Sequence, residues 1–390
     1  MRILVAPDSF KGSLSSKSVG EIIKSAFISE IPDVLVDVLP MADGGEGTTD
    51  ALLFSTVGEK VKVKITGPMG NQTEAFYGLL NDSQTVVIEV ASIAGYTKVP
   101  DKKRDPFYLT SFGIGECVTH ALDSGYRKFI FCLGGSSTND AGIGLLQALG
   151  VNFENKDRNK LAPFPYVFDS IEYVDYSNVD KRIWESDFRV ACDVENPLCG
   201  VNGATYVFGP QKGVKDLELN KLDNSIKRYA ELIESHLQVN LMNMKGAGAA
   251  GGLGFALLSI GAKIESGAKL IAKHLNLEEK IMESEWLITG EGRTDEQTLQ
   301  GKLPFEVANI AKNNSVPTIL ISGSLEGDLE QFYTVFESIH SISSGPLSME
   351  ESIKNTENLL HHKARNIARL LKFARVDSST KIYSKEINFN

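Results

Sequence analysis

The sequence has few cysteines and no apolar run long enough to cross a membrane. Its cysteines, Cys117, Cys132, Cys192 and Cys199, lack C-x-x-C spacing, and its six histidines form no H-x-H or H-x-x-x-H pair. Neither a disulfide framework nor a zinc site is therefore expected. Nowhere do eighteen apolar residues run together, and the first residues lack the longer apolar stretch of a signal peptide. We expect a cytoplasmic protein with no membrane partner.

A basic excess is also absent. Forty Lys and Arg residues stand against fifty Asp and Glu residues, which leaves a net charge of −10. Because a nucleic-acid backbone is held mainly by basic side chains, we expect no nucleic-acid partner. Apolar residues make up 42% of the chain and charged residues 23%, so a wholly disordered chain is excluded. The 390 residues predict two or three domains.

Several familiar nucleotide-binding motifs are missing. The chain contains no G-x-x-x-x-G-K-[ST] string and neither of the protein-kinase triplets H-R-D and D-F-G, which excludes a standard P-loop and a protein kinase. Gly246, Gly248 and Gly251 fit the spacing G-x-G-x-x-G, but the preceding residues, LMNMK, are a poor strand. A dinucleotide-binding turn needs a strand before its glycines, so this match is weak.

Short buried strands followed by amphipathic helices begin and end the chain. Such an alternation is typical of a parallel sheet, whereas residues 61–65 alternate apolar and lysine residues and predict antiparallel pairing. In the middle of the chain, residues 188–192 and 205–208 read as strands, and residues 216–237 as a long amphipathic helix. The predicted strands of the two ends are residues 2–6, 34–39, 286–289 and 317–322.

The simplest architecture is an α/β fold of two domains with the active site in the cleft between them. We predict a doubly wound, Rossmann-like or flavodoxin-like parallel sheet formed by residues 1–60 and 285–375. A mixed α/β domain, residues 61–284, is inserted into it. The polar stretch 376–390 reads as a loosely held C-terminal tail.

Five loops share one character, because each is rich in small residues and four of them carry acidic residues. Four of the loops follow a predicted strand, where open α/β sheets bind their ligands. Glycines let backbone N–H groups approach an anion, and adjacent helix N-termini add further donors, so these loops predict phosphate binding. They are residues 6–13 (APDSFKGS), 41–48 (MADGGEGT), 134–144 (GGSSTNDAGIG), 245–254 (KGAGAAGGLG) and 289–302 (TGEGRTDEQTLQGK).

The acidic residues of these loops would repel a phosphate unless a divalent cation lay between them. Hard oxygen ligands favour Mg²⁺. Lysine and arginine residues supply the positive charge that a transferring phosphoryl group or a substrate carboxylate requires. Together these features predict an ATP-dependent kinase of a small molecule. The residues concerned are Asp8, Asp43, Glu46, Asp140, Glu291 and Asp295 among the acids, and Lys11, Lys212, Arg293 and Lys302 among the bases.

Structural interpretations of the same residues stay open. A loop aspartate is often a helix cap, so Asp43, Asp140, Asp193 and Asp295 are each compatible with that role. A lone Gly-Gly pair is more often a turn than a ligand cradle. The recurrence of five similar loops is what favours the functional interpretation.

The loops, in their order, resemble those of the bacterial glycerate kinase family, and the resemblance covers about residues 1–372. It is carried by APDSFKGS, LPMADGGEGT, GGSSTNDAGIG, FGPQKG, GAGAAGGLG and ITGEGRTDEQTLQGK. It implies transfer of the ATP γ-phosphoryl group to D-glycerate in a cleft between two α/β domains, with the 2-hydroxyl favoured as the acceptor and the 3-hydroxyl left open as the alternative. This chain departs from the family at Ala141, where a glycine is expected, and in its longer tail.

We assign residue roles from their chemistry. Lys11 would stabilise the transferring phosphoryl group, and Asp193 or Asp295 would accept the proton of the attacking hydroxyl. Asp8, Ser9 and Arg293, with Lys212 as a second choice, would bind glycerate. Asp43, Glu46, Asp140 and Glu291 would hold Mg²⁺. The predicted contacts to the nucleotide phosphates are Gly134, Gly135, Ser136, Thr138, Gly246, Gly248, Gly251 and Gly252.

Two other functions fit parts of the sequence. One is a non-catalytic sensor of a small phosphorylated acid, although such a site would not need so many acids. The other is a nicotinamide-linked hydroxyacid dehydrogenase, which the missing strand before Gly246 disfavours. The oligomeric state stays open, and a homodimer is one assembly that the sequence allows.

Overall fold

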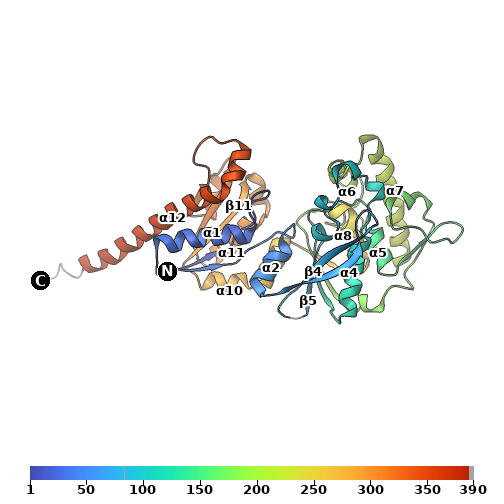
Figure 1. Ribbon diagram of the computed structural model, residues 1–390, viewed down its shortest axis with the longest axis horizontal. Helices are drawn as coiled ribbons and strands as arrows, with labels where there is room; N and C mark the ends of the chain where they lie inside the picture. Colours follow the sequence, from blue (N-terminus) through green and yellow to red (C-terminus); the bar gives the residue numbers. More distant parts are fainter. Residues whose placement is uncertain (83, 386–390) are drawn as a thin grey trace. The chain divides into compact units, whose positions relative to one another are not determined.

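The chain forms two compact α/β units, as the computed structural model in Figure 1 shows. The structure describes residues 1–82 and 84–385. Unit 1 comprises Met1–Ala42 and the chain from Ile271 onward, and unit 2 comprises Asp43–Leu270. The predicted α/β fold with one unit inserted into the other is therefore present.

Unit 1 is built on a five-stranded parallel sheet in the order β13-β12-β11-β1-β2. Renumbered along this unit alone, the order is 2-1-3-4-5, which is the flavodoxin-like doubly wound arrangement. Unit 2 enters the chain between β2 and β11. The strands are β1 (Arg2–Val5), β2 (Leu35–Val38), β11 (Trp286–Thr294), β12 (Thr318–Leu325) and β13 (Ser338–Ser341).

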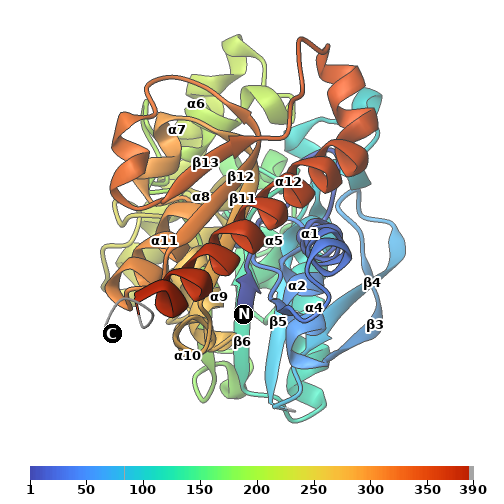
Figure 2. The same cartoon turned by 90° about the vertical axis from the view of Figure 1, so that its left-hand side faces the viewer.

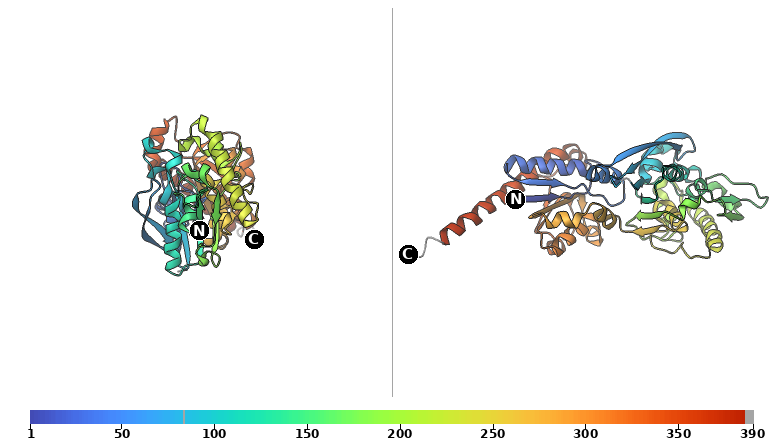
Figure 3. Two further views of the ribbon diagram at one scale, coloured as in Figure 1. Left: turned by 90° about the vertical axis from the view of Figure 1, so that its right-hand side faces the viewer. Right: turned by 90° about the horizontal axis from the view of Figure 1, so that it is seen from below.

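Helices cover both faces of this sheet. Side chains alternate between the faces of a strand, so Ile3 and Val5 pack with α1 (Ser16–Glu30) and α12 (Met349–Lys385), which contact each other (Figure 2). On the other face, Leu320 packs with Ala308 of α11 (Leu303–Asn313). Figure 3 shows α1 and α11 on opposite sides of the sheet. The chain therefore continues to one face of the sheet after β1 and to the other face after β11.

The predicted C-terminal tail, residues 376–390, is helical over most of its length. Helix α12 continues to Lys385, and the last five residues lie outside the described part of the chain. Among the described residues, no helix is both long enough and apolar enough to span a membrane.

Unit 2 contains a mixed six-stranded sheet in the order β10-β9-β6-β5-β4-β3. The first four of these strands are parallel, and β4 and β3 are antiparallel to their neighbours. The antiparallel pairing predicted from the alternating lysines of β3 is present. The strands are β3 (Glu59–Thr66), β4 (Gln72–Leu79), β5 (Thr85–Glu89), β6 (Lys128–Cys132), β9 (Asp187–Ala191) and β10 (Lys263–Glu265); β7 (Asn152–Glu154) and β8 (Tyr173–Asp175) form a separate pair.

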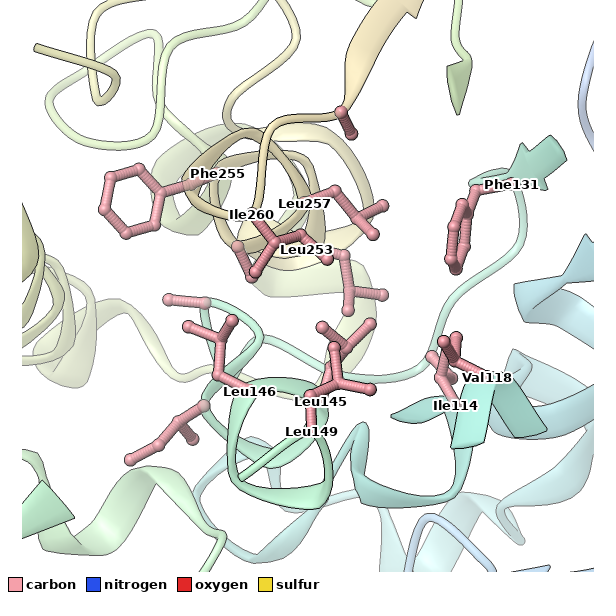
Figure 4. Close-up of a cluster of buried hydrophobic side chains, with 14 of the residues drawn as sticks. Ile114, Val118, Phe131, Leu145, Leu146, Leu149, Leu253, Phe255, Leu257 and Ile260 are labelled. Atoms are coloured by element: carbon pink, nitrogen blue, oxygen red, sulfur yellow. The ribbon is translucent and has the colours of Figure 1, made fainter. Parts of the chain in front are cut away.

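The core of unit 2 is a layer of aliphatic and aromatic side chains between the sheet and its helices. Figure 4 shows Leu145 and Leu149 facing Leu253 and Leu257, with Phe131 of β6 beside them. The helices are α2 (Thr48–Thr56), α3 (Val90–Ala94), α4 (Phe112–Asp123), α5 (Ile143–Ala148), α6 (Ala204–Phe208), α7 (Asp216–Leu237) and α8 (Ala249–Ser259); α9 (Gly267–His274) spans the boundary, and α10 (Leu277–Met282) belongs to unit 1.

One predicted strand is wrong. Residues 205–208 form the end of helix α6, although their β-branched and aromatic side chains favour a strand in isolation. The sheet offers this segment no partner: Ala204 and Thr205 are buried, whereas Val207 is exposed. Tertiary packing has overridden the local preference.

The boundaries between the units differ from the expected residues 60 and 285. Helix α2 packs on β4 and β5, so residues 43–60 belong to unit 2. At the other end, α10 contacts α11 of unit 1, and unit 1 resumes at Ile271. Packing partners, rather than the change in sequence texture at Val61, decide where each unit begins.

Candidate active site

In unit 1, the loops after β1 and β11 meet at the point where the strand order reverses. The Asp8 N–H donates to the carbonyl of Gly290 at 2.8 Å. A Cβ atom on Gly292 would lie 3.1 Å from the Lys11 backbone nitrogen, so the two loops are in close backbone contact there. Ligands of doubly wound sheets bind at this reversal, beyond the carboxyl ends of the strands. The structure thus brings the first and fifth predicted loops together.

The first loop presents one buried acid and one exposed base. Asp8 is buried, and its Oδ1 accepts a hydrogen bond from the Ser9 N–H at 2.7 Å. Lys11 is exposed on a tight turn closed by the hydrogen bond from the Phe10 N–H to the Leu14 carbonyl. The turn fixes the Lys11 backbone at the reversal point and leaves its ammonium group on the surface.

Glu291 is buried at the same edge of the sheet. The hydroxyls of Thr294 and Thr298 donate to its Oε1 at 2.9 and 2.8 Å. Burial raises the pKa of Glu291, and these hydrogen bonds partly oppose that effect. Sequence reasoning missed both threonines, although their spacing of three and seven residues after Glu291 was a usable signal. Because one oxygen is already occupied, Glu291 is a weaker metal ligand than predicted.

Asp295 belongs to an ion-pair network with Arg293, Lys302 and Glu326. Its Oδ1 lies 3.0 Å from the Lys302 Nζ and also accepts the Gln297 N–H, and its Oδ2 lies 3.4 Å from the Arg293 Nε. Although partial burial opposes ionisation, the hydrogen bond and charge of Lys302 lower the pKa of Asp295. Asp295 is therefore a helix cap and ion-pair partner, and the lowered pKa makes it a poor proton acceptor.

In unit 2, the loops after β6 and β9 meet the predicted second loop. A Cβ atom on Gly44 would lie 2.8 Å from the carbonyl oxygen of Ala191, which ends β9. One on Gly134 would lie 2.5 Å from the Cα of Gly45, and the Gly134 N–H donates to the Gly44 carbonyl at 3.2 Å. These contacts require glycine and place all three segments at the carboxyl edge of the parallel strands.

The backbone carbonyl of Asp43 and the carboxylate of Asp193 both lie close to Gly267 at this edge. The Gly267 N–H donates to Asp193 Oδ1 at 2.9 Å. A Cβ atom added to Gly267 would lie 2.0 Å from the Asp43 carbonyl oxygen and 3.2 Å from Asp193 Oδ2. Asp193 is exposed, Asp43 is half-buried and Glu46 is exposed. Two predicted acids, distant in sequence, are thereby brought together.

Glu89, which the sequence analysis did not identify, occupies the N-terminus of helix α2. Its carboxylate accepts the N–H groups of Gly47 at 3.1 Å and Thr49 at 2.9 Å. Burial raises the pKa of Glu89, and these two hydrogen bonds partly offset the effect. An acid ending the otherwise apolar strand TVVIE was the available signal. The amide of Gly47 in the second loop and that of Thr49 just after it already bind a carboxylate, so they do not form a phosphate cradle.

The third loop changes from exposed to buried along its length. Gly135 is exposed with φ at 75°, whereas the segment from Ser136 to Asp140 is buried. Lys212 lies beneath it and donates from Nζ to Ser136 Oγ and to the Thr138 carbonyl, both at 2.7 Å. Burial lowers the pKa of Lys212 to about 7. Lys212 therefore supports this loop, and the expectation that it grips the glycerate carboxylate is withdrawn.

Asp140 is completely buried, and its carboxylate is saturated with donors. Its Oδ2 accepts the Ser111 N–H at 2.8 Å and the Ser111 hydroxyl at 2.6 Å, and its Oδ1 accepts the Gly142 N–H at 3.1 Å. Burial raises the pKa of Asp140 despite these hydrogen bonds. We correct its predicted role as a metal ligand, because it ties the third loop to the N-terminus of α4 instead.

Asp140→Ala should therefore act on stability. The substitution leaves the buried donors of Ser111 and Gly142 without an acceptor. We therefore expect the free energy of unfolding to fall by about 3 kcal/mol. Glu46→Ala, at an exposed acid of the same predicted metal set, should change it by less than about 0.5 kcal/mol. Urea unfolding measures both values. If the two variants are equally stable, the buried hydrogen bonds of Asp140 do not stabilise the fold, and Asp140 returns to the predicted Mg²⁺ ligands.

The glycines of the fourth loop serve packing. A Cβ on Gly248 would lie 2.2 Å from the Pro197 carbonyl oxygen, and one on Gly251 would lie 2.1 Å from that of Thr138. The residues before them form turns rather than a strand. The G-x-G-x-x-G match is thus no dinucleotide-binding turn, which removes the support for the dehydrogenase alternative. Gly246, Gly248, Gly251 and Gly252 are all buried, and we correct their assignment as phosphate contacts.

The residues described by the structure contain no group of three His, Cys, Asp or Glu side chains that could hold a metal ion. Mg²⁺ is usually bound by one or two carboxylates together with water and substrate phosphates. Asp43 and Glu46, the accessible acids of the predicted metal set in unit 2, are compatible with that pattern.

Comparison with known sequences decides the family. The model of the glycerate kinase family matches residues 3–372, which is nearly the whole chain. The chain belongs to the glycerate kinase family. The resemblance noted in the sequence is confirmed.

Relatives within the glycerate kinase family align over almost their full length. The protein named glycerate 2-kinase from Escherichia coli (strain K12) is 40% identical over 95% of this chain and 98% of its own. A glycerate kinase from Bacillus subtilis (strain 168) is 39% identical over 96% and 99%. A crystal structure from Salmonella typhimurium LT2, described as a "putative glycerate kinase 2", superposes with a TM-score of 0.86 at 41% identity and covers 96% of this chain and 99% of that one.

Proposed function

We propose that the protein transfers the γ-phosphoryl group of ATP to the 2-hydroxyl of D-glycerate and so forms 2-phosphoglycerate. The observation that carries this proposal is the alignment over nearly the whole chain with a relative named glycerate 2-kinase. A bond forms between the hydroxyl oxygen and the γ-phosphorus, and the bond from that phosphorus to the β–γ bridging oxygen breaks. The hydroxyl proton passes to a carboxylate of the protein.

Asp193 is our choice for the carboxylate that accepts this proton. It is exposed at the carboxyl edge of the unit 2 sheet, where the Gly267 N–H donates to its Oδ1. The rival, Asp295, is engaged by Lys302 and by its own helix cap. A general base must reach the proton it removes, and an accessible carboxylate satisfies that condition.

Lys11 is our choice for the charge on the transferring group. Phosphoryl transfer passes through a loose transition state with charge on the equatorial oxygens, so positioned cations supply much of the catalysis. In the same unit, Asp8, Ser9 and Arg293 are the proposed glycerate contacts. Arg293 is 61% exposed and pairs with Glu326 at 2.8 Å, so a glycerate carboxylate would have to replace that partner.

The third loop, with half-buried Gly134, exposed Gly135 and the adjoining Ser136 and Thr138, is our proposed binding segment for the nucleotide phosphates. Asp43 and Glu46 are the proposed Mg²⁺ ligands, because they are the accessible members of the predicted set near this loop. When bound, Mg²⁺ would neutralise phosphate charge. The protein's own groups would orient the nucleotide and hold the hydroxyl near the base.

The test measures ADP release in a coupled assay with D-glycerate, ATP and Mg²⁺, followed by phosphorus NMR of the product. We expect ADP formation that requires both D-glycerate and Mg²⁺, and a phosphate resonance coupled to the C2 proton. A resonance coupled to the C3 protons would assign the reaction to the 3-hydroxyl. Silence with all components present would favour the sensor.

A further inference from the structure

Lys212 is a buried cation without a carboxylate partner within 4 Å among the residues that the structure describes. Its side chain is 4% exposed, and Nζ donates only to Ser136 Oγ and the Thr138 carbonyl. Asp140 is the one charged group that acts on it, and that carboxylate is already saturated by Ser111 and Gly142. An isolated buried charge is costly, so the charged form of Lys212 would be stabilised by an anion that arrives from outside.

The hydrogen bond from Lys212 fixes the polarity of the Ser136 hydroxyl. An ammonium group has donors only, so Ser136 Oγ must be the acceptor. The hydroxyl hydrogen of Ser136 then remains to be donated elsewhere, and no acceptor for it occurs among the described residues. The adjacent Gly135 is exposed, so the buried end of the loop continues directly into its accessible end.

Two further polar atoms of the same segment have no partner in the described part of the chain. They are Thr138 Oγ1 and Asn139 Oδ1, and both side chains are completely buried. Buried polar groups are nearly always hydrogen-bonded, so unpaired ones concentrated in one loop need an explanation. Phosphate oxygens only accept, so a bound phosphate would pair the Thr138 hydroxyl, whereas Asn139 Oδ1 needs a donor such as a water molecule.

We propose that Lys212 is a positioning residue that turns the Ser136 hydroxyl into a hydrogen-bond donor for a nucleotide phosphate oxygen, and that its buried positive charge favours the anion. The inference rests on the proposed function, because it assigns the third loop to the nucleotide. Ser136 contacts the phosphate, and Lys212 acts through Ser136 and through its charge.

The test is the dissociation constant of ADP, measured by isothermal titration calorimetry with Mg²⁺ and without glycerate. Ser136→Ala removes the donor, and Lys212→Met removes the charge that orients it. A hydrogen bond to a charged group corresponds to about a tenfold or larger change in affinity. We therefore expect each variant to raise the Kd of ADP about tenfold or more.

Two matched controls separate this role from loop structure. Ser137→Ala alters the neighbouring hydroxyl, which donates to the Ala94 carbonyl and cannot face the ligand. Lys215→Met removes an exposed lysine three residues from Lys212. Both controls should keep the Kd of the unmodified protein. If Ser137→Ala weakens ADP binding as much as Ser136→Ala does, the loop is merely structural and the proposal is overturned.

The double variant tests whether Lys212 acts through Ser136. Because both changes remove parts of one interaction, Ser136→Ala with Lys212→Met should bind ADP no more weakly than about twofold beyond Lys212→Met alone. If the losses of ADP affinity in the two single variants add fully in the double variant, Lys212 does not act through Ser136 and the proposal is overturned. Should Lys212→Met fail to fold, Ser136→Ala with its Ser137→Ala control still decides the question.

Proton uptake supplies a readout that a structural role would not move. The pKa of Lys212 is about 7, because burial disfavours its charge, and an arriving anion should raise it. Just above pH 7, binding of ADP should therefore take up protons, which appears as a binding enthalpy that depends on the buffer's ionisation enthalpy. The uptake should be smaller in Lys212→Met. Equal uptake in both proteins contradicts the proposed charge.

These measurements distinguish failure of the inference from failure of the proposed function. If the unmodified protein does not bind ADP, the nucleotide role of unit 2 is wrong and the inference falls with it. If it binds ADP and the variants of Lys212 and Ser136 bind equally well, only the inference is overturned.

Discussion

Lys11→Met should lower the kcat of glycerate phosphorylation by about 10² to 10³, the usual effect of removing one group that stabilises transition-state charge. Lys11 is exposed on its turn after β1, so its ammonium group contributes little to folding. The turn itself depends on the backbone hydrogen bonds of Phe10, Ser13 and Leu14, which the substitution leaves intact. The loss should therefore appear in turnover, with the thermal unfolding midpoint unchanged.

The matched control is Lys17→Met, an exposed lysine on helix α1 of the same unit. It removes the same charge from the same unit, away from the strand-order reversal. Steady-state kinetics with D-glycerate and ATP should give near-normal kcat for this control. If Lys11→Met retains near-normal kcat, Lys11 has no part in the reaction, whatever its position at the sheet edge.

Gly251→Ala should destabilise unit 2 by at least about 3 kcal/mol. The added Cβ would lie 2.1 Å from the Thr138 carbonyl oxygen and 2.8 Å from the Asn139 Cα, and both of these atoms are backbone. The residue also has φ at 71°, a left-handed conformation that alanine rarely adopts. The Ala141 N–H donates to the Gly251 carbonyl, so the strain passes directly to the third loop.

Gly261→Ala separates the clash from the backbone conformation. Gly261 also has positive φ, at 88°, but no atom lies within 4 Å of its added Cβ. Gly261→Ala should lower the free energy of unfolding by only about 1 kcal/mol. Urea unfolding in a Trp286→Phe background lets Trp184 report on unit 2 alone, since the chain has two tryptophans, one in each unit. If the two alanine variants lose the same free energy of unfolding, the clash of the added Cβ with Thr138 has no energetic cost.

Local patterns in the sequence predicted the regular elements where pattern and packing agree. Residues 216–237 have the helical periodicity of α7, and β3 has the alternation of an antiparallel strand, so both were predicted well. The backbone at Ala141 also agrees with what the sequence led us to expect. This residue stands where the family resemblance led us to expect a glycine, and its φ of 45° is the conformation that favours glycine.

The candidate site could be predicted only in outline. Glycine and acid content identified the loops, and the predicted strands placed them at sheet edges. Whether a given glycine approaches a ligand or another backbone depends on what packs against it, and Gly251 meets Thr138. Asp140 and Asp193 look alike in sequence, yet one is buried under three donors and the other is exposed.

The sequence by itself determined the family, the α/β class, the order of the elements and the loops that concentrate glycine and acids, because these follow from local periodicity and from motifs that are contiguous along the chain. Only the tertiary structure decided which acids are accessible, that Glu89 caps α2, and that Lys212 is a buried cation beneath Ser136. Those properties depend on neighbours far apart in sequence. Burial and hydrogen bonding set the charge and reach of a side chain, and both are fixed by packing.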